Sequence, residues 1–142
     1  MPKLTAKGRV KKGEIPSTVR RSSARAQRTF AKTHDAAAEQ YGEGERAHRV
    51  AFASLKHNYE KIGDHWERKD EAGPSDERAE SGGPNARGEA AEGVYANATK
   101  DHLYDIAKEL NIGGRSRMNK AELVTAIRKE NRKRSREANN RD

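Results

Sequence analysis

Apolar residues recur at helical spacing in the first third of the chain. Ser22 and Ser23 offer side-chain oxygens for a helix N-cap, and the apolar positions after them lie three or four residues apart, or at sums of these spacings. These positions are Ala26, Phe30, Ala37 and Tyr41. Gly42 and Gly44 follow and end the predicted helix.

A second apolar stripe predicts another amphipathic helix, which packs on the first. The stripe consists of Ala47, Val50, Ala51, Leu55, Tyr59 and Ile62. Most of the charged residues in this stretch lie off the stripe. Gly63 ends the predicted helix, and Trp66 is expected to close the helix pair as a lid. Ile15 and Val19 are expected to cover its other end.

The end of the chain predicts a helix, an extended loop and a second helix. Thr99 is a suitable N-cap for a helix that ends at Gly113 and Gly114. Asn119, with Glu122 three residues later, forms an Asn variant of the capping box and opens the second helix. The inward positions are Leu103, Ile106, Ala107 and Leu110 in the first helix, and Leu123, Val124 and Ile127 in the second. No strand pattern of useful length occurs, so the predicted fold class is all-α.

Residues 70–98 have a different composition from the stretches around them. They contain five Gly and two Pro, few large apolar residues and a net charge of −5. Such a stretch predicts a flexible, disordered linker that lets two modules move independently. The predicted organisation is a basic disordered tail (1–13), a helical domain (14–69), the linker (70–98), a helix–loop–helix module (99–131) and a basic tail (132–142).

Composition and charge narrow the class of protein. Of the 142 residues, 37% are charged and 32% hydrophobic, so small domains of marginal stability are expected and a large active-site cleft is not. The net charge of +8 favours polyanions, and it is concentrated in residues 1–13 and 99–142, each with a net charge of +5. The chain has no cysteine and no apolar run long enough for a membrane span, so we expect a cytoplasmic protein without disulfides.

Residues 14–69 resemble the ChaB family. The resemblance is carried by the order of Ile15-Pro-Ser-Thr-Val, Ala26-Gln27, Phe30, Tyr41 and the run from Glu45-Arg-Ala-His-Arg-Val-Ala-Phe-Ala-Ser-Leu-Lys-His-Asn-Tyr to Trp66. The family is small, bacterial and mostly helical. Its description as a regulator of a cation/proton antiporter implies a partner on the cytoplasmic face of a membrane.

Residues 99–128 resemble the N-terminal helical domain of the transcription terminator Rho. The matching runs are Thr99-Lys-Asp-His-Leu-Tyr-Asp-Ile-Ala-Lys-Glu-Leu-Asn-Ile and Gly114-Arg-Ser-Arg-Met-Asn-Lys-Ala-Glu-Leu-Val-Thr-Ala-Ile. The resemblance implies a SAP-like helix–extended-loop–helix module. Such modules are associated with nucleic-acid binding, although many serve only as docking units. The chain lacks an ATPase or RNA-binding barrel that would make it a terminator itself.

The candidate nucleic-acid site lies in this last module. Arg115, Arg117 and Lys120 converge at the start of the second helix, where free backbone amides and the helix dipole favour a phosphate. The basic residues beyond them either extend the helix or form a tail that orders on contact. The full set of candidates is Lys100, Arg115, Arg117, Lys120, Arg128, Lys129, Arg132, Lys133 and Arg134.

Other chemistry has little support in the sequence. His48 and His57 lie about 13 Å apart on one helix, too far to share a metal ion, so no metal or other cofactor is expected. No carboxylate pair, phosphate loop or activated serine suggests catalysis, so no catalytic residue is assigned. The aromatic residues lie mostly on the core stripes, with Phe52 the exception, and His34 and His57 are expected to meet between the helices.

The leading hypothesis is a non-enzymatic, nucleic-acid-associated accessory protein. Its C-terminal module would bind DNA or RNA phosphates with little sequence preference, and its ChaB-like module would bind a protein partner. Two alternatives remain open: a regulator docking on a cation antiporter, and a protein-docking adaptor with no nucleic-acid ligand. The sequence does not distinguish DNA from RNA or give the oligomeric state.

Overall fold

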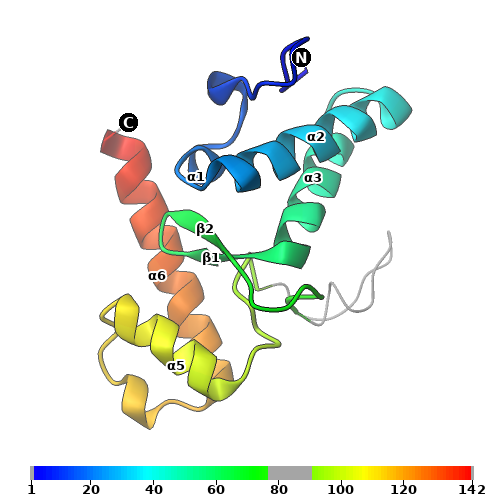
Figure 1. Cartoon of the computed structure of the whole chain (residues 1–142). Helices are drawn as coiled ribbons and strands as arrows, with labels where there is room; N and C mark the ends of the chain where they lie inside the picture. The colour runs from blue at the N-terminus through cyan, green and yellow to red at the C-terminus, as the bar shows by residue number, and fades with distance from the viewer. Residues whose placement is uncertain (1, 77–90, 142) are drawn as a thin grey trace.

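The computed structural model describes residues 2–76 and 91–141, and its fold is mainly helical (Figure 1). The N-terminal half contains the 3-10 turn η1 (Lys12–Glu14), the helices α1 (Ser17–Arg20), α2 (Ala24–Tyr41) and α3 (Glu45–Asn58), and the strands β1 (Tyr59–Ile62) and β2 (His65–Arg68). The C-terminal half contains α5 (Lys100–Glu109), the 3-10 turn η2 (Arg115–Arg117) and α6 (Lys120–Arg141). The mainly helical class predicted from the sequence is confirmed.

Helices α2 and α3 form the predicted pair. Ser23 caps α2, because its Oγ accepts a hydrogen bond from the Ala26 amide at 3.2 Å. Phe30 and Leu55 are fully buried between the helices. The predicted stripes are wrong at Tyr41 and Val50, which are 44% and 37% exposed. Tyr41 is the last residue of α2, and Val50 directly precedes the buried Ala51 on α3 but is itself exposed.

The second helix ends earlier than predicted, and a β-hairpin follows it. Helix α3 stops at Asn58, and Tyr59–Ile62 pairs antiparallel with His65–Arg68. The predicted continuation of the helix to Ile62 is therefore wrong, as is the absence of strands. The spacing that placed Tyr59 and Ile62 on a helical stripe also allows them to be buried from a strand. Trp66 lies on β2 and is buried against the core, as its predicted role as a lid requires.

The first residues are held against α2, which corrects the prediction of a disordered tail over 1–13. The amides of Lys3 and Leu4 donate to the two carboxylate oxygens of Asp35 at 2.8 and 3.0 Å. Leu4 and Val10 form an antiparallel bridge, and Val10 packs on the core of the helix pair. This short basic segment is ordered because a carboxylate on α2 satisfies its backbone amides.

The predicted linker 70–98 is packed at both of its described ends. Residues 77–90 of it lie outside the described residues. On one side, the Ser75 hydroxyl donates to the Lys56 carbonyl at 2.9 Å. On the other, the Ala91 amide donates to the Asp76 carboxylate at 2.9 Å, and Val94 is buried in the C-terminal core. The linker prediction is therefore too wide at both ends.

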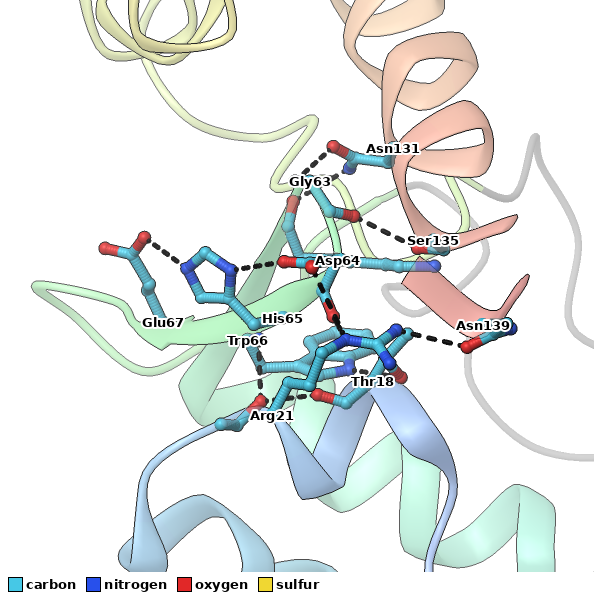
Figure 2. A network of polar contacts seen from close by, with 12 residues as sticks. Thr18, Arg21, Gly63, Asp64, His65, Trp66, Glu67, Asn131, Ser135 and Asn139 are labelled. Atoms are coloured by element: carbon cyan, nitrogen blue, oxygen red, sulfur yellow. Dashed lines mark hydrogen bonds and ion pairs between the residues drawn. The ribbon is translucent and has the colours of Figure 1, made fainter. Parts of the chain in front are cut away.

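Helix α6 joins the two halves of the chain. It runs from α5 past the hairpin to α1 (Figure 1). The hairpin turn at Gly63 is bonded to two α6 side chains, Asn131 and Ser135 (Figure 2). Near the end of α6, Asn139 accepts hydrogen bonds from Ser17 at 2.5 Å and from Arg21 at 3.2 Å. These contacts join the two halves, whose apolar cores are separate clusters, and the independent motion of the modules stays a prediction.

The caps predicted for the C-terminal module are confirmed. The Thr99 hydroxyl accepts from the His102 amide at 3.2 Å. The Asn119 side chain accepts from the Glu122 amide at 2.8 Å, and the Glu122 carboxylate accepts from the Asn119 amide at 3.0 Å. This reciprocal pair is a complete capping box. The predicted apolar faces of α5 and α6 meet in one core, in which Leu103, Leu123 and Ile127 are fully buried.

Candidate nucleic-acid interface

The basic end of the chain is a continuation of the helix, which decides between the two alternatives left open for 132–142. Helix α6 extends to Arg141, and three small or polar residues on its inner side, Asn131, Ser135 and Ala138, are buried. Their spacing of four and three residues places them on one face of the helix. This face packs on the hairpin, so the opposite face points away from the protein.

The outward face of α6 is strongly basic. Its cations form two rows at helical spacing, with successive members of each row four residues apart and about 6 Å along the axis. One row is Arg128, Arg132 and Arg136, and the other is Lys129 and Lys133. All except the half-buried Arg128 are exposed. Phosphates along one strand of nucleic acid can be met by charges arranged in such rows.

A shallow hollow of about 420 Å³ lies beside the lysine row. Its lining includes residues 111–113, which follow α5 in the chain, and Lys129, Lys133 and Arg136 of α6. Glu130 is the one carboxylate among the lining residues in the described part of the chain. Three cations line this open hollow, and cations can form charge-assisted hydrogen bonds with a phosphate group.

The loop residues are less available for a phosphate than the sequence suggests. Arg115 is half-buried, and its Nη1 donates to the Ile112 carbonyl at 2.9 Å, which ties it to the loop. A carboxylate already lies at the start of α6, because Glu122 accepts a hydrogen bond from the Asn119 amide there. Arg117 and Lys120 are exposed on the same side of the module. The outward face of α6 is therefore a better candidate for phosphate binding than the start of the helix.

The remaining candidates are distributed differently. Lys100 is exposed at the first position of α5. Arg134 points toward the fold, where it bonds to the Glu130 carboxylate at 3.0 Å and to the Leu110 carbonyl at 2.8 Å. Arg132 forms two hydrogen bonds with the Glu92 carboxylate, at 2.7 and 2.5 Å. Arg134 is thus a structural residue, whereas Arg132 lies on the exposed face and already holds an anion.

A buried polar cluster, which the sequence did not predict, joins the two halves of the chain. Glu60 is 3% exposed, and both of its carboxylate oxygens lie 2.9 Å from His102 Nε2. Burial raises the pKa of Glu60, while the contact with His102 opposes this effect. Lys69 is also buried, and its Nζ donates to the Gly73 carbonyl at 2.8 Å and lies 4.2 Å from the centroid of the Tyr95 ring. Burial lowers the pKa of Lys69 to about 8, although the negative charges of Glu60 and Asp76 act to raise it.

The hairpin turn carries a second group of ion pairs (Figure 2). His65 lies 3.0 Å from Asp64 and 2.8 Å from Glu67. Burial lowers the pKa of His65, but these two carboxylates outweigh it and the pKa is raised overall. Arg21 donates to the Asp64 backbone carbonyl at 3.0 Å. These contacts hold the turn against α1.

The aromatic and histidine residues take mainly packing roles. Phe52 is half-buried, with ring centroids 4.9 Å from both Phe30 and His48, so it lines the core. The predicted meeting of His34 and His57 is not found. His34 is buried and bonds to Asp35 at 3.0 Å, while His57 is exposed. Within residues 2–76 and 91–141, no three His, Asp or Glu side chains lie close enough to hold a metal ion.

Comparison with protein-family models confirms the two resemblances. Residues 15–69 match the ChaB family model, and residues 97–135 match the model of the N-terminal domain of the Rho termination factor. The second match extends into α6 as far as Ser135, which agrees with a helix that continues beyond residue 131. The class defined by fold and sequence is therefore a two-module helical protein, with a ChaB-type module followed by a Rho N-terminal-type module. No curated protein and no solved structure matches the chain.

None of the helices within the described residues has the length and apolar character needed to cross a membrane. The longest, α6, carries cations along most of its length.

Proposed function

We propose that this protein is a non-enzymatic, cytoplasmic accessory protein that holds the phosphate backbone of DNA or RNA along the outward face of α6. The observation that carries the proposal is the pair of rows formed by Arg128, Arg132, Arg136, Lys129 and Lys133 on one face of a 22-residue helix. The match to the Rho N-terminal domain supports a nucleic-acid ligand.

The arrangement favours binding with little sequence preference. Phosphate contacts position a protein on nucleic acid but carry no sequence information by themselves. Most of the aromatic rings that could stack on bases lie in or against the apolar cores. If three to five phosphates are neutralised, the logarithm of affinity should fall against the logarithm of salt concentration with a slope of about −3 to −5 on duplex DNA.

Fluorescence anisotropy with labelled duplex DNA and single-stranded RNA, at several salt concentrations, tests the proposal. The triple variant Lys129→Gln, Lys133→Gln, Arg136→Gln should bind unrelated sequences more weakly and should reduce the salt slope by up to about 3. The variant Arg115→Ala, Arg117→Ala, Lys120→Ala measures the contribution of the loop, and we expect its effect to be smaller.

A matched control separates a local site from the effect of net charge. Arg25, Arg28 and Lys32 form an exposed basic row on α2, remote in sequence from α6. Their replacement by Gln removes the same three charges and should change the affinity much less than the α6 variant. Equal losses in both variants, or no binding by the wild-type protein at low salt, would contradict the proposed site.

We further propose that the ChaB-like module binds a protein partner. Purification from a native lysate with and without nuclease tests this point. A protein that remains bound after nuclease treatment is the expected partner, and recovery of a cation antiporter would favour the regulator alternative.

A further inference from the structure

One cation on the outward face of α6 already holds a carboxylate from elsewhere in the chain. Arg132 donates from Nε to Glu92 Oε2 at 2.7 Å and from Nη2 to Glu92 Oε1 at 2.5 Å. The contact is bidentate, and the residues are 40 positions apart in sequence. Both side chains are largely exposed, Arg132 by 61% and Glu92 by 44%. A ligand from solvent can therefore reach the pair.

The backbone around Glu92 is fixed in a way that aims its side chain at α6. Glu92 has a φ of +53°, in the left-handed region that a residue with a side chain rarely adopts. The turn is held by hydrogen bonds from the Lys61 amide to the Gly93 carbonyl at 2.9 Å and from the Val94 amide to the Ala91 carbonyl at 3.0 Å. An unusual backbone conformation persists only where surrounding contacts hold it in place, and these two hydrogen bonds do so here.

Other cations add to the positive potential at this carboxylate. The hydrogen bonds from Arg132 hold the pKa of Glu92 below its ordinary value, and the charges of Arg128 and Lys61 lower it further. Lys61 belongs to β1 of the ChaB-like module, whereas Arg128 and Arg132 belong to α6. The positive potential around Glu92 therefore comes from both modules.

We propose that Glu92 is an internal mimic of a backbone phosphate, which occupies a phosphate-binding site at Arg132 and is displaced when nucleic acid binds. This inference rests on the proposed function and deepens it. A guanidinium holds carboxylate and phosphate oxygens in the same forked geometry, so one can replace the other at Arg132. The exchange needs only rotation of the exposed Glu92 side chain, because its backbone is pinned by the turn. In the free protein the carboxylate weakens binding to any polyanion.

The variant Glu92→Gln tests the inference, because it keeps the shape of the side chain and removes its charge. Labelled duplex DNA should bind Glu92→Gln about three- to tenfold more tightly than wild type at low salt. Glu39→Gln is the matched control. Glu39 is an exposed carboxylate on α2, and the same loss of charge there should change affinity less than about twofold.

A second pair of variants, both lacking Arg132, shows whether the gain in affinity depends on Arg132. Arg132→Gln alone should weaken binding, and adding Glu92→Gln to it should bring no further gain, because the competing contact is already absent. A gain that is equal in Glu92→Gln and Glu39→Gln, or one that persists without Arg132, would overturn the proposal while leaving nucleic-acid binding intact.

Inorganic phosphate gives a readout that does not depend on nucleic acid. The ¹H–¹⁵N signal of Arg132 Nε should shift on addition of phosphate, at lower concentration in Glu92→Gln than in wild type. If DNA and RNA bind no variant but phosphate moves this signal, the proposed function fails and the anion site stands. If phosphate leaves the signal unchanged in both proteins, the site itself is disproved.

Discussion

The side chain of Asn131 bonds to both sides of the hairpin turn at Gly63. Its Oδ1 accepts from the Gly63 amide at 2.6 Å, and its Nδ2 donates to the Lys61 carbonyl at 2.9 Å. Gly63 has a φ of +68°, and a side chain there would approach Arg134 and Leu110. A Cβ there would lie at ordinary contact distance from both, so glycine is needed for the positive φ of the turn rather than for a close approach to α6. A single amide thus satisfies two backbone groups of the ChaB-like module from a helix of the other module.

We predict that Asn131→Ala lowers the free energy of unfolding by about 2–4 kcal/mol, because it leaves buried backbone groups of the turn without partners. Urea denaturation followed by circular dichroism measures this loss. Asn140→Ala is the matched control, since Asn140 is exposed on the same helix and should change stability by less than about 0.5 kcal/mol. Two separate transitions in the wild-type protein would show that the modules are not coupled.

The core of the ChaB-like module gives a second prediction. Leu55 is fully buried on α3, so Leu55→Ala should cost about 2–5 kcal/mol. Val50 lies on the same helix but is 37% exposed, and Val50→Ala should cost less than about 0.5 kcal/mol. Thermal unfolding of the two variants provides the comparison. Equal losses would mean that Val50 is buried in solution by a partner or by a second copy of the chain.

The features that the sequence predicts well depend on residues close together in the chain. The capping pair of Asn119 and Glu122 needs only a helix and a spacing of three residues. The hairpin was missed because the spacing of Leu55, Tyr59 and Ile62 suits a helix, and only the packing of Trp66 on the core favours a strand pair. A short apolar run does not by itself distinguish the two structures.

The sequence indicates the types of residue in the candidate site but not their arrangement in space. The sequence shows that basic residues are concentrated after residue 114, yet it does not show which of them face solvent. That division depends on the contact between Asn131 and Gly63, which are 68 positions apart. Likewise, the pairing of Arg132 with Glu92 could not be inferred, because Glu92 lies in a stretch whose composition predicts a flexible linker.

The buried Lys69 should make stability depend on pH. Below about pH 8 its ammonium is charged in both states, and the folded protein carries the full cost of burying it. Between this value and the ordinary pKa of 10.5, the unfolded chain keeps a proton that the folded protein has lost. Stability should therefore rise with pH in this window, on the order of 1–3 kcal/mol.

Urea denaturation at about pH 7.5 and about pH 9.5 measures the effect of Lys69 when wild type is compared with Lys69→Met. Other groups titrate in the same range, so the difference between the two proteins isolates the contribution of Lys69. The variant should lack the wild-type rise. If both proteins change stability by the same amount, the ammonium of Lys69 is not desolvated in the folded state.

The turn that carries Glu92 gives the last prediction, which concerns Gly93. A Cβ at this position would lie 2.5 Å from Cη2 of Trp66, and the φ of +94° is one that side chains rarely adopt. Trp66 is 4% exposed, so its ring cannot move away from this Cβ without disturbing the core on which it packs. Gly93→Ala should therefore lower the free energy of unfolding by about 2–4 kcal/mol, through overpacking and backbone strain together.

Gly113→Ala is the control, because a Cβ there meets nothing within 4 Å and its φ is not positive. Thermal denaturation, together with the near-ultraviolet circular dichroism of Trp66, compares the variants. A stable Gly93→Ala protein with an unchanged tryptophan signal would mean that the turn does not pack on Trp66.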